Sequence, residues 1–463
     1  MSRFTFLANV SIVKYSCEHF HLGMLSLRSI FGLDKIDAER RSIFAGSWAG
    51  WIMDSYDLSM MFLLIVPMSQ VFFPSGQGQL AIIQTLSTYL ITFLFRPVGG
   101  LIFGSLGDRI GRKRSMIITL IGLGVSVFLT GLIPTFAQIG LVAVGLLVMM
   151  RALTGIFAGG EYGNSVAILM ESVPVQVRGR IGGILHGGYP VGFTLAALTF
   201  LSLNLGLTPA TFAQFGWRVM FFTGIIPALV GLVLRLKMPE SLLWGKLKRE
   251  EIEKAPIRSL FTKKSYVLAW MSGFLAMAGV SWLYSLTLGF FPTILPRFVN
   301  IGYPWSIYIQ IAAIVVSFGG YVAAGLIGDY VGRRRTIVLF VILGLLSVPA
   351  TYFMLNVGYS YIIVGTLACL LSFFVIGVYG VMPSYLSEKF PTKIRSTGVN
   401  WAFNSGFIVG GWSSVIVLLL GDLVGAGNFY VALSAGIVVG ELFLLASALI
   451  SKETSKINLE SLV

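Results

Sequence analysis

The sequence has few charged residues, few cysteines and few histidines. Asp, Glu, Lys and Arg make up 11% of the 463 residues, 56% are hydrophobic, and the mean hydropathy is +0.87. A soluble domain contains about 25% charged residues, so that class is excluded. The two cysteines, Cys17 and Cys369, give neither a disulfide framework nor a metal-binding spacing. There is also no phosphate-binding loop and no nucleophile elbow, so we expect no metal site, no cofactor and no enzymatic activity.

Basic residues outnumber acidic ones, and the formal net charge is +14. If the amino terminus is cytoplasmic, 29 of the 33 Lys and Arg residues fall on that side of the membrane, in loops and tails or, for Arg235, at the inner end of a span. Arg218 and Arg297 fall on the other side, and Arg96 and Arg151 fall within hydrophobic spans. Because cationic residues collect on the cytoplasmic side, we predict that both termini are cytoplasmic in a multi-pass protein of the cell membrane. The same placement argues against a nucleic-acid surface.

Long hydrophobic runs are abundant, and each is long enough for the ~20 residues that a membrane-crossing helix needs. No alternating strand pattern is present. The predicted fold class is therefore an all-α membrane protein with twelve transmembrane helices. The predicted spans are 43–73, 79–103, 115–133, 137–168, 181–205, 217–236, 268–295, 304–327, 336–355, 359–384, 398–420 and 427–451.

Two segments recur in the chain. "GSLGDRIGRKRS" at 104–115 matches "GLIGDYVGRRRT" at 325–336, and "ESVPVQVR" at 171–178 matches "EKFPTKIR" at 388–395. We call the first pair of segments the cassettes. Both pairs fall at the same place in each set of six spans, so the two halves are repeats.

The repeats and spans predict five regions. Residues 1–42 lack the hydrophobic core and cleavage site of a signal peptide, and the sequence leaves open whether Met1 or Met24 is the true start. We predict a cytoplasmic tail at 1–42, a six-helix bundle at 43–236, a cytoplasmic linker at 237–267, a second six-helix bundle at 268–451 and a tail at 452–463.

The cassettes fit the pattern G-x-x-x-D-x-x-G-R-[KR], which resembles the major facilitator superfamily over nearly the whole chain. That resemblance implies two pseudo-symmetric six-helix bundles around a central site, and alternating access by rocking of one bundle against the other. "RPVGG" in span 2 and "GGEYG" in span 4 resemble the metabolite:proton symporters. "GWIMDSYD" in span 1 resembles the sialate, lactate and aromatic-acid symporters, and "PESLLW" after span 6 is similar to the sugar-porter signature.

The cassettes predict a gate between the bundles. Gly104 and Gly111 allow close approach and a tight turn, Asp108 can lie at a helix amino terminus, and the arginines can pair across the bundle interface. Alternatively the cations serve only topology, which we favour for Lys113, Arg114, Arg334 and Arg335. The predicted gating residues are Gly104, Asp108, Gly111, Arg112, Glu171, Arg178, Asp329, Gly332, Arg333, Glu388 and Arg395.

Ionisable residues near the bilayer centre are candidates for function because each costs several kcal/mol there. Asp54 and Asp57 lie roughly 16 and 21 Å along span 1 and share a helix face. Two carboxylates so close are not expected to ionise together, which predicts proton-carrier chemistry. The alternative is a hydrogen-bonded aspartate that only stabilises a helix contact.

Arg151 lies near the middle of span 4 and needs an anion as partner. Sugar and organic-acid symporters of the superfamily pair an acidic residue of span 1 with an arginine of span 4, and Asp57 and Arg151 match those positions. The resemblance therefore implies that protonation of Asp57 frees Arg151. Glu161 is expected to pair with arginines of the inner loops, and Glu441 is expected to be structural.

Arg96 is the leading substrate contact, because its fork of donors suits a carboxylate. The alternative is that it extends to the cytoplasmic headgroups. His186, Tyr189, Asn400 and Asn404 are further substrate-binding candidates, although an interior histidine is commonly structural and asparagines also bridge helices.

The function predicted from the sequence is proton-coupled symport that imports a small organic acid. The expected partners are an organic anion, protons as coupling ion and membrane lipid, and the expected functional unit is a monomer. A proton-coupled sugar or polyol porter is the nearest alternative, followed by an efflux antiporter and a transport-inactive receptor.

Overall fold

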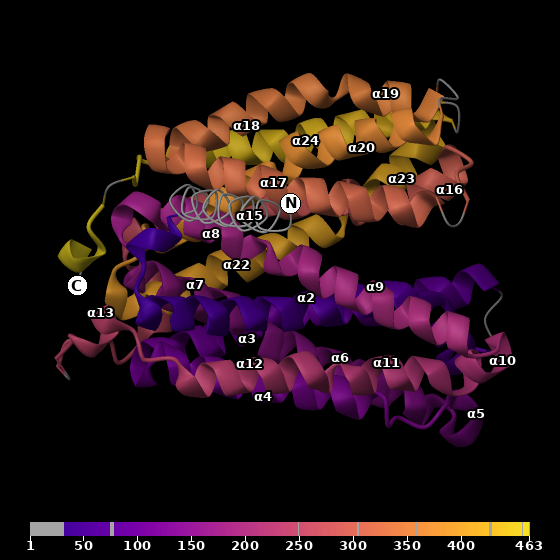
Figure 1. Cartoon of the computed structure of the whole chain (residues 1–463), viewed down its shortest axis with the longest axis horizontal. Coiled ribbons are helices and arrows are strands. Elements are labelled where there is room, and N and C mark those ends of the chain that lie inside the picture. Colours follow the sequence, from indigo (N-terminus) through magenta and orange to yellow (C-terminus); the bar gives the residue numbers. More distant parts are fainter. Residues whose placement is uncertain are drawn as a thin grey trace, which may run out of the picture.

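The structure is a computed structural model that describes residues 32–74, 78–248, 250–302, 305–356, 360–425, 428–455 and 457–462. Within these ranges, twelve helical segments are long and apolar enough to cross a membrane, which confirms the predicted fold class. They form two groups of six that lie side by side with their axes roughly aligned (Figure 1). The predictions about Cys17 and Met24 lie outside the described residues.

The first bundle contains six spans, three of which are interrupted. Its helices are α2 (Ala38–Phe72), α3 (Gly78–Ile110), α4 (Arg112–Thr130), α6 (Leu141–Gly159) continued by α7 (Glu161–Ser172), α8 (Arg178–His186) continued by α9 (Gly188–Gly206), and α11 (Trp217–Thr223) continued by α12 (Ile225–Lys237).

The second bundle repeats this order. Its helices are α15 (Lys264–Leu286) with α16 (Phe291–Phe298), α17 (Trp305–Val331), α18 (Arg333–Ser347) with α19 (Pro349–Asn356), α20 (Tyr361–Ile376) with η4 (Gly377–Val381) and α21 (Met382–Ser387), α22 (Arg395–Gly411) with α23 (Ser413–Val424), and α24 (Phe429–Ile450).

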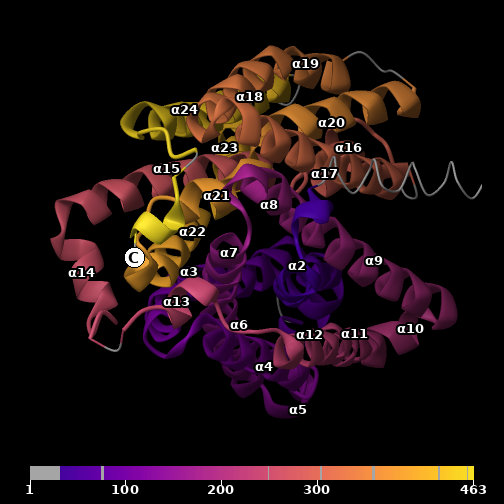
Figure 2. The ribbon, with the colours of Figure 1, turned by 60° about the vertical axis from the view of Figure 1, so that its left-hand side comes forward.

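Short helices lie in the connections. The linker between the bundles contains α13 (Leu242–Gly245) and α14 (Pro256–Thr262), and α14 lies against α15 at the edge of the second bundle (Figure 2). The remaining short helices are η1 (Leu33–Lys35), α5 (Phe136–Ile139), η2 (Val175–Val177), α10 (Pro209–Thr211), η3 (Phe212–Gly216), η5 (Thr392–Ile394) and η7 (Leu459–Leu462).

The cassettes are more helical than the predicted spans implied. Span 2 was predicted to end at residue 103, but α3 continues to Ile110, and only Gly111 turns the chain into α4. Gly111 and its counterpart Gly332 both have φ of +108°, a conformation that residues with a Cβ rarely adopt. The polar cassette residues continue the helix because their side chains have hydrogen-bond and ion-pair partners at the helix end. Hydropathy alone does not indicate these partners.

The turns at Gly111 and Gly332 lie at the same end of the two bundles, which we call the cassette end; it is the left end in Figure 1, where the carboxyl terminus also lies. The bundles meet there through two equivalent contacts: α22 packs on α3 and α7, and α17 packs on α8. A Cβ at Gly325 would collide with the carbonyl of Gly179, and one at Gly104 would lie 2.8 Å from the Cα of Thr397. Glycine at these positions therefore lets the bundles touch through their backbones.

We predict that Gly325→Val separates the bundles at the cassette end. A bulky side chain at so close a contact costs about 1–3 kcal/mol, which corresponds to an open population at least roughly fivefold larger. The measurement is maleimide labelling of Ser396→Cys, a buried position in the other contact of the cassette end, between α22 and α3, in a protein with Cys17 and Cys369 replaced by serine.

Gly145→Val is the matched control, because a Cβ there meets nothing within 4 Å. Unchanged labelling in Gly325→Val would show that this contact does not hold the bundles together.

Candidate functional site

Asp54 and Arg96 form an ion pair between α2 and α3. Arg96 donates from Nη1 to Oδ1 of Asp54 at 3.0 Å and from Nη2 to Oδ2 at 2.6 Å. Both side chains are only 1% exposed. Arg96 also donates from Nε to Oδ1 of Asn404 in α22, at 3.3 Å, so each of its three nitrogens donates a hydrogen bond. The geometry is the two-point contact that guanidinium and carboxylate make at their strongest.

Asp57 and Arg151 form a second buried pair, between α2 and α6. Nη1 of Arg151 lies 3.3 Å from Oδ1 of Asp57, and Nη2 donates to Oγ1 of Thr130 at 2.9 Å. The guanidinium also lies 5.6 Å from the ring centroid of Phe221. The contact predicted from the sequence is thus present, while its part in proton coupling stays a prediction.

The structure changes the interpretation of the two aspartates. From the sequence, Asp54 and Asp57 were expected to be neighbouring carboxylates in the same buried environment. Instead each has its own guanidinium, Arg96 on one side and Arg151 on the other. Two cations therefore balance two anions, and close carboxylates alone give no reason for either to hold a proton in this conformation. Arg96, predicted as the leading substrate contact or as a residue that extends to the headgroups, is bound to Asp54 in this structure, and its part in substrate binding stays a prediction.

Asn400 and Asn404 of α22 hold open the interruption between α6 and α7. In a continuous helix the N–H of Gly163 would donate to the carbonyl of Gly159. Here the N–H of Gly163 donates to Oδ1 of Asn400 at 2.8 Å, and the carbonyl of Gly159 accepts from Nδ2 of Asn404 at 2.7 Å. Two backbone groups freed inside the membrane region are thus satisfied by side chains of the opposite bundle.

His186 belongs to a group of stacked rings between the bundles. We call this group the central aromatic cluster: Trp51, Tyr162, His186, Tyr379 and Phe403. The His186 ring lies 4.1 Å from that of Tyr379, and its Nε2 lies 3.2 Å from the hydroxyl of Tyr162. Tyr189 lies apart from this stack, where its hydroxyl bonds to that of Tyr284 across the bundle interface.

At the cassette end, Asp108 of the first cassette caps a helix of the second bundle. Its carboxylate accepts from the N–H of Ser396 at 3.0 Å, and from the N–H and hydroxyl of Thr397 at 2.9 and 2.6 Å. These groups begin α22, where a negative charge is stabilised by the helix dipole. Arg112 supports the carboxylate at 3.3 Å.

Asp329 of the second cassette makes the same contact in the opposite direction. It accepts from the N–H of Gly179 at 2.7 Å and from the N–H of Arg180 at 3.0 Å, at the beginning of α8 in the first bundle. Arg333 lies 2.9 Å from this aspartate and donates to Glu388 at 3.0 and 3.2 Å. The prediction that the cassette aspartates lie at helix amino termini is therefore correct in geometry.

The second pair of repeats is used asymmetrically. Glu171 accepts from Arg112 at 3.2 Å and from Arg395 at 2.6 Å, so it bridges the two bundles. Arg178, the counterpart of Arg395, donates instead to the carbonyl of Ile457 in the carboxyl-terminal tail, at 2.9 Å. The tail therefore takes part in closing the cassette end on that side.

Two helix caps were missed by the sequence analysis. Glu240 accepts from the N–H groups of Arg112 and Lys113 at the beginning of α4, at 3.0 and 3.2 Å. Glu453 accepts from those of Arg333 and Arg334 at the beginning of α18, at 2.8 and 3.1 Å. A Glu followed by Ser or Thr after the last span of each half was the available signal.

Glu453 keeps its charge at neutral pH. Burial alone raises the pKa of its carboxyl, but the backbone N–H groups of Ser455, Arg333, Thr454 and Arg334 together lower this pKa below its ordinary value. Because the pKa is lowered, the cap is fully formed above the ordinary value and weakens only as the pH falls through the lowered one.

Glu161 was expected to pair with arginines of the inner loops, but it pairs with Arg235 inside the first bundle. Nη1 of Arg235 donates to Oε2 of Glu161 at 2.9 Å, and both residues are buried. Gly50 leaves the room for this pair, since a Cβ there would collide with both side chains. Glu441 is buried against Gly344, and neither of its carboxylate oxygens has a hydrogen-bond partner among the described residues.

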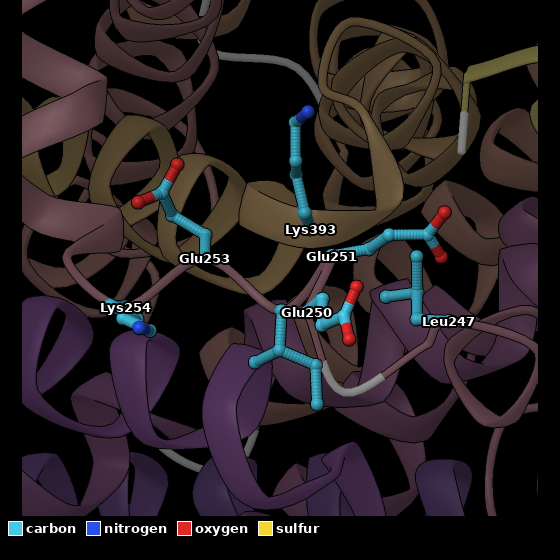
Figure 3. Close-up of a pocket in the computed structure, with 7 residues that line it drawn as sticks. Leu247, Glu250, Glu251, Glu253, Lys254 and Lys393 are labelled. Carbon is cyan, nitrogen blue, oxygen red and sulfur yellow. The ribbon is translucent and has the colours of Figure 1, made fainter.

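A pocket of about 470 Å³ lies in the linker, away from the buried ion pairs (Figure 3). It is lined by Leu247, Glu250, Glu251, Ile252, Glu253, Lys254 and Lys393. Its charged groups are spread around the opening and do not converge on one point, so we do not assign a ligand to it.

Known proteins resemble this chain over most of its length. The "Inner membrane metabolite transport protein YhjE" of Escherichia coli is 31% identical over 419 residues, which cover 88% of this chain and 94% of that protein. The "Proline/betaine transporter" of the same organism is 29% identical over 410 residues, covering 86% and 80%.

A solved structure shows the same fold. The proton:xylose symporter XylE superposes with a TM-score of 0.76 at 18% identity, over 92% of this chain and 98% of that one. The family model of the Major Facilitator Superfamily matches residues 52–414. The chain is therefore a multi-pass membrane transporter that belongs to the Major Facilitator Superfamily.

Proposed function

We propose that the protein is a proton-coupled symporter that imports a small organic anion across the cell membrane. The observation that carries this proposal is the Asp54–Arg96 pair, buried to 1% exposure in the interior of a transporter. The pair is a neutral unit in a region where neither charge is stable without the other. A solute that binds here has to leave that neutrality intact.

A proton and a carboxylate meet this condition together. The proton neutralises Asp54, and the carboxylate of the solute takes its place on the fork of Arg96. If the anion bound alone, Asp54 would remain charged without a partner, and if the proton bound alone, Arg96 would. Each ligand therefore strengthens the binding of the other, and this reciprocity is the basis of coupled transport.

The Asp57–Arg151 pair supports the same proposal. It is also neutral and buried, and apart from Asp57 the guanidinium donates only to the Thr130 hydroxyl among the described residues. Protonation of Asp57 would release Arg151 within the first bundle, where its other contacts are Thr130 of α4 and Phe221 of α11. We assign it a role in coupling rather than in direct contact with the solute.

We further propose that the cassette end faces the cytoplasm, because the basic residues gather in its loops and tails. Because the bundles are held together at this end, the proposal places the entry to the central site at the opposite, external face. Proton and anion would enter there and leave when the cassette end opens. One chain holds both bundles and both ion pairs, which supports a functional monomer.

A second candidate is transport of a zwitterion. An ammonium group on Asp54 and a carboxylate on Arg96 would keep the site neutral without any proton, and the similar proline/betaine transporter carries such solutes by name. A sugar or polyol has no charge to exchange, so the pair would have no part in binding it. Proton movement with the solute separates these cases.

We predict that reconstituted protein accumulates carboxylates under a proton gradient and that Asp54→Asn abolishes this accumulation. With one proton per anion, a gradient of one pH unit supports about tenfold accumulation. Asp54→Asn keeps the shape of the side chain but removes the proton-binding group, so exchange of anion across the membrane should continue without accumulation. The measurement is uptake and exchange of radiolabelled carboxylates in proteoliposomes, with internal pH recorded.

Asp37→Asn, an exposed helix cap in α2, is the control for an Asp-to-Asn change. Accumulation that persists in Asp54→Asn would contradict the proposed coupling, and accumulation that persists in Asp57→Asn would remove the Asp57–Arg151 pair from it. Uptake of betaine without proton movement would favour the zwitterion instead.

A further prediction concerns the gate. Asp329→Asn should weaken the contact between α17 and α8, because a charged cap with two backbone N–H bonds contributes about 1–2 kcal/mol, which corresponds to a roughly fivefold to thirtyfold larger population open at the cassette end. The readout is again labelling of Ser396→Cys, this time as the ratio of rates with and without substrate. Glu460→Gln, which removes an exposed partner of Lys246, is the control and should leave the rates unchanged. Equal rates in Asp329→Asn and the parent protein would remove Asp329 from the gate.

A further inference from the structure

Three polar groups of the central aromatic cluster are buried without a hydrogen-bond partner among the described residues. They are Nε1 of Trp51, Nδ1 of His186 and the hydroxyl of Tyr379. Their residues are 4%, 0% and 5% exposed. Buried polar groups nearly always have partners, because an unmet donor loses its bonds to water and gains nothing in return. Three such groups in one cluster call for an explanation.

The three groups come from both bundles. Trp51 lies in α2 and His186 in α8, while Tyr379 lies in η4 of the second bundle. The His186 ring stacks on Tyr379 at 4.1 Å and meets Trp51 edge-on at 5.7 Å. These are ring-centroid distances, so the three rings that carry the unpartnered atoms are neighbours in one cluster.

The cluster is continuous with the Asp54–Arg96 pair. The Arg96 guanidinium lies 5.7 Å from the ring of Phe407, which lies 4.7 Å from Phe403 of the cluster. Tyr379 is also close enough to interact electrostatically with both charges of the pair. A solute whose carboxylate binds Arg96 would therefore extend along these rings toward the unpartnered groups.

We propose that Trp51, His186 and Tyr379 form a second subsite for the part of the solute remote from its carboxylate. The substrate class that fits is a ring-shaped carboxylic acid with a hydroxyl or keto oxygen on the side of the ring opposite the carboxylate. The indole N–H and the phenol are donors to that oxygen, and flat rings suit a wall of aromatic side chains. This inference rests on the proposed function, since it takes Arg96 as the carboxylate contact.

The arrangement disfavours a quaternary ammonium at this subsite. Cation–π binding needs an open ring face. Tyr162 stacks on Phe403 at 3.6 Å and His186 stacks on Tyr379 at 4.1 Å, so these faces cover each other. The cluster also contains no carboxylate. The cluster presents ring edges and hydrogen-bonding groups that have no partner among the described residues.

The test compares matched acids in proteoliposomes: benzoate with 4-hydroxybenzoate, and cyclohexanecarboxylate with 4-hydroxycyclohexanecarboxylate. We expect wild-type protein to prefer the hydroxylated member of each pair in kcat/KM. In Tyr379→Phe and in Trp51→Phe the preference should fall about fivefold to tenfold, as expected for one lost hydrogen bond. Tyr321→Phe is the matched control, because the Tyr321 hydroxyl accepts from Ser317 at 3.2 Å.

The outcomes separate the two proposals. If wild-type protein carries these acids with protons but shows no preference, or if Tyr379→Phe and Trp51→Phe leave the preference unchanged, the second subsite is refuted and the proposed symport stands. If no carboxylate is carried with a proton, both are refuted. If Tyr321→Phe reduces the preference as much as the other two, the effect is one of ring packing and the subsite is again refuted.

Discussion

The ion pair between Asp54 and Arg96 is the constraint that the centre of this protein is built around. Its charges can lie in the interior only because α2 and α3 bring them to hydrogen-bonding distance. The packing of neighbouring helices serves the same end: a Cβ at Gly155 or Gly159 of α6 would collide with the backbone of α3 at Thr92 and Arg96. Small residues thus let α3 lie directly on α6, and this places Arg96 beside α2 on one side and α22 on the other. A larger residue at either glycine would move the guanidinium away from its carboxylate.

Helix α22 connects this pair to the gate. Its amino terminus is capped by Asp108 of the opposite bundle, its Asn400 and Asn404 satisfy the interrupted backbone between α6 and α7, and Asn404 also accepts from Arg96. A change in the hydrogen bonding of Arg96 therefore reaches Asn404 directly. The same asparagine is released when α22 moves away from α3 and α7. Movement of α22 and rearrangement of the ion pair are consequently linked through one side chain, which gives a physical route between occupancy of the centre and closure at the cassette end.

Much of the fold and some of the site followed from the sequence. Twelve spans and two repeated halves were predictable, because hydropathy and repetition are visible in one dimension. That Arg151 needs an anionic partner was also predictable, but the choice of Asp57 came from the resemblance to symporters of the superfamily. The partner of Arg96 was not, since two aspartates three residues apart differ by ~60° around a helix, enough for Asp54 to face α3 while Asp57 faces α6. Likewise Arg235 appeared to belong to a loop, and its pairing with Glu161 depends on the space left at Gly50. A cap such as Glu240 depends on which helix end lies next to the linker. The spacing of residues along the sequence does not give this information.

The two halves share their gates but not their chemistry. Cassettes, turn glycines and the caps Glu240 and Glu453 recur in both bundles, so the parts that hold the bundles together are symmetric. The buried charges at the centre are not symmetric. Arg96 lies eight residues before Gly104, and the equivalent position before Gly325 is Ser317. Helix α15, the counterpart of α2, contains no acidic residue. The second bundle instead offers amides and rings, in Asn404, Phe403 and Tyr379. If the bundles rock against each other as proposed, the contacts at the cassette end would open in equivalent ways, whereas rearrangement at the centre would involve the two ion pairs of the first bundle. Because the central pairs lie in one half, charge balance at the centre has to be kept in that half alone. Through the side chain of Asn404, the second bundle hydrogen-bonds to the Asp54–Arg96 pair.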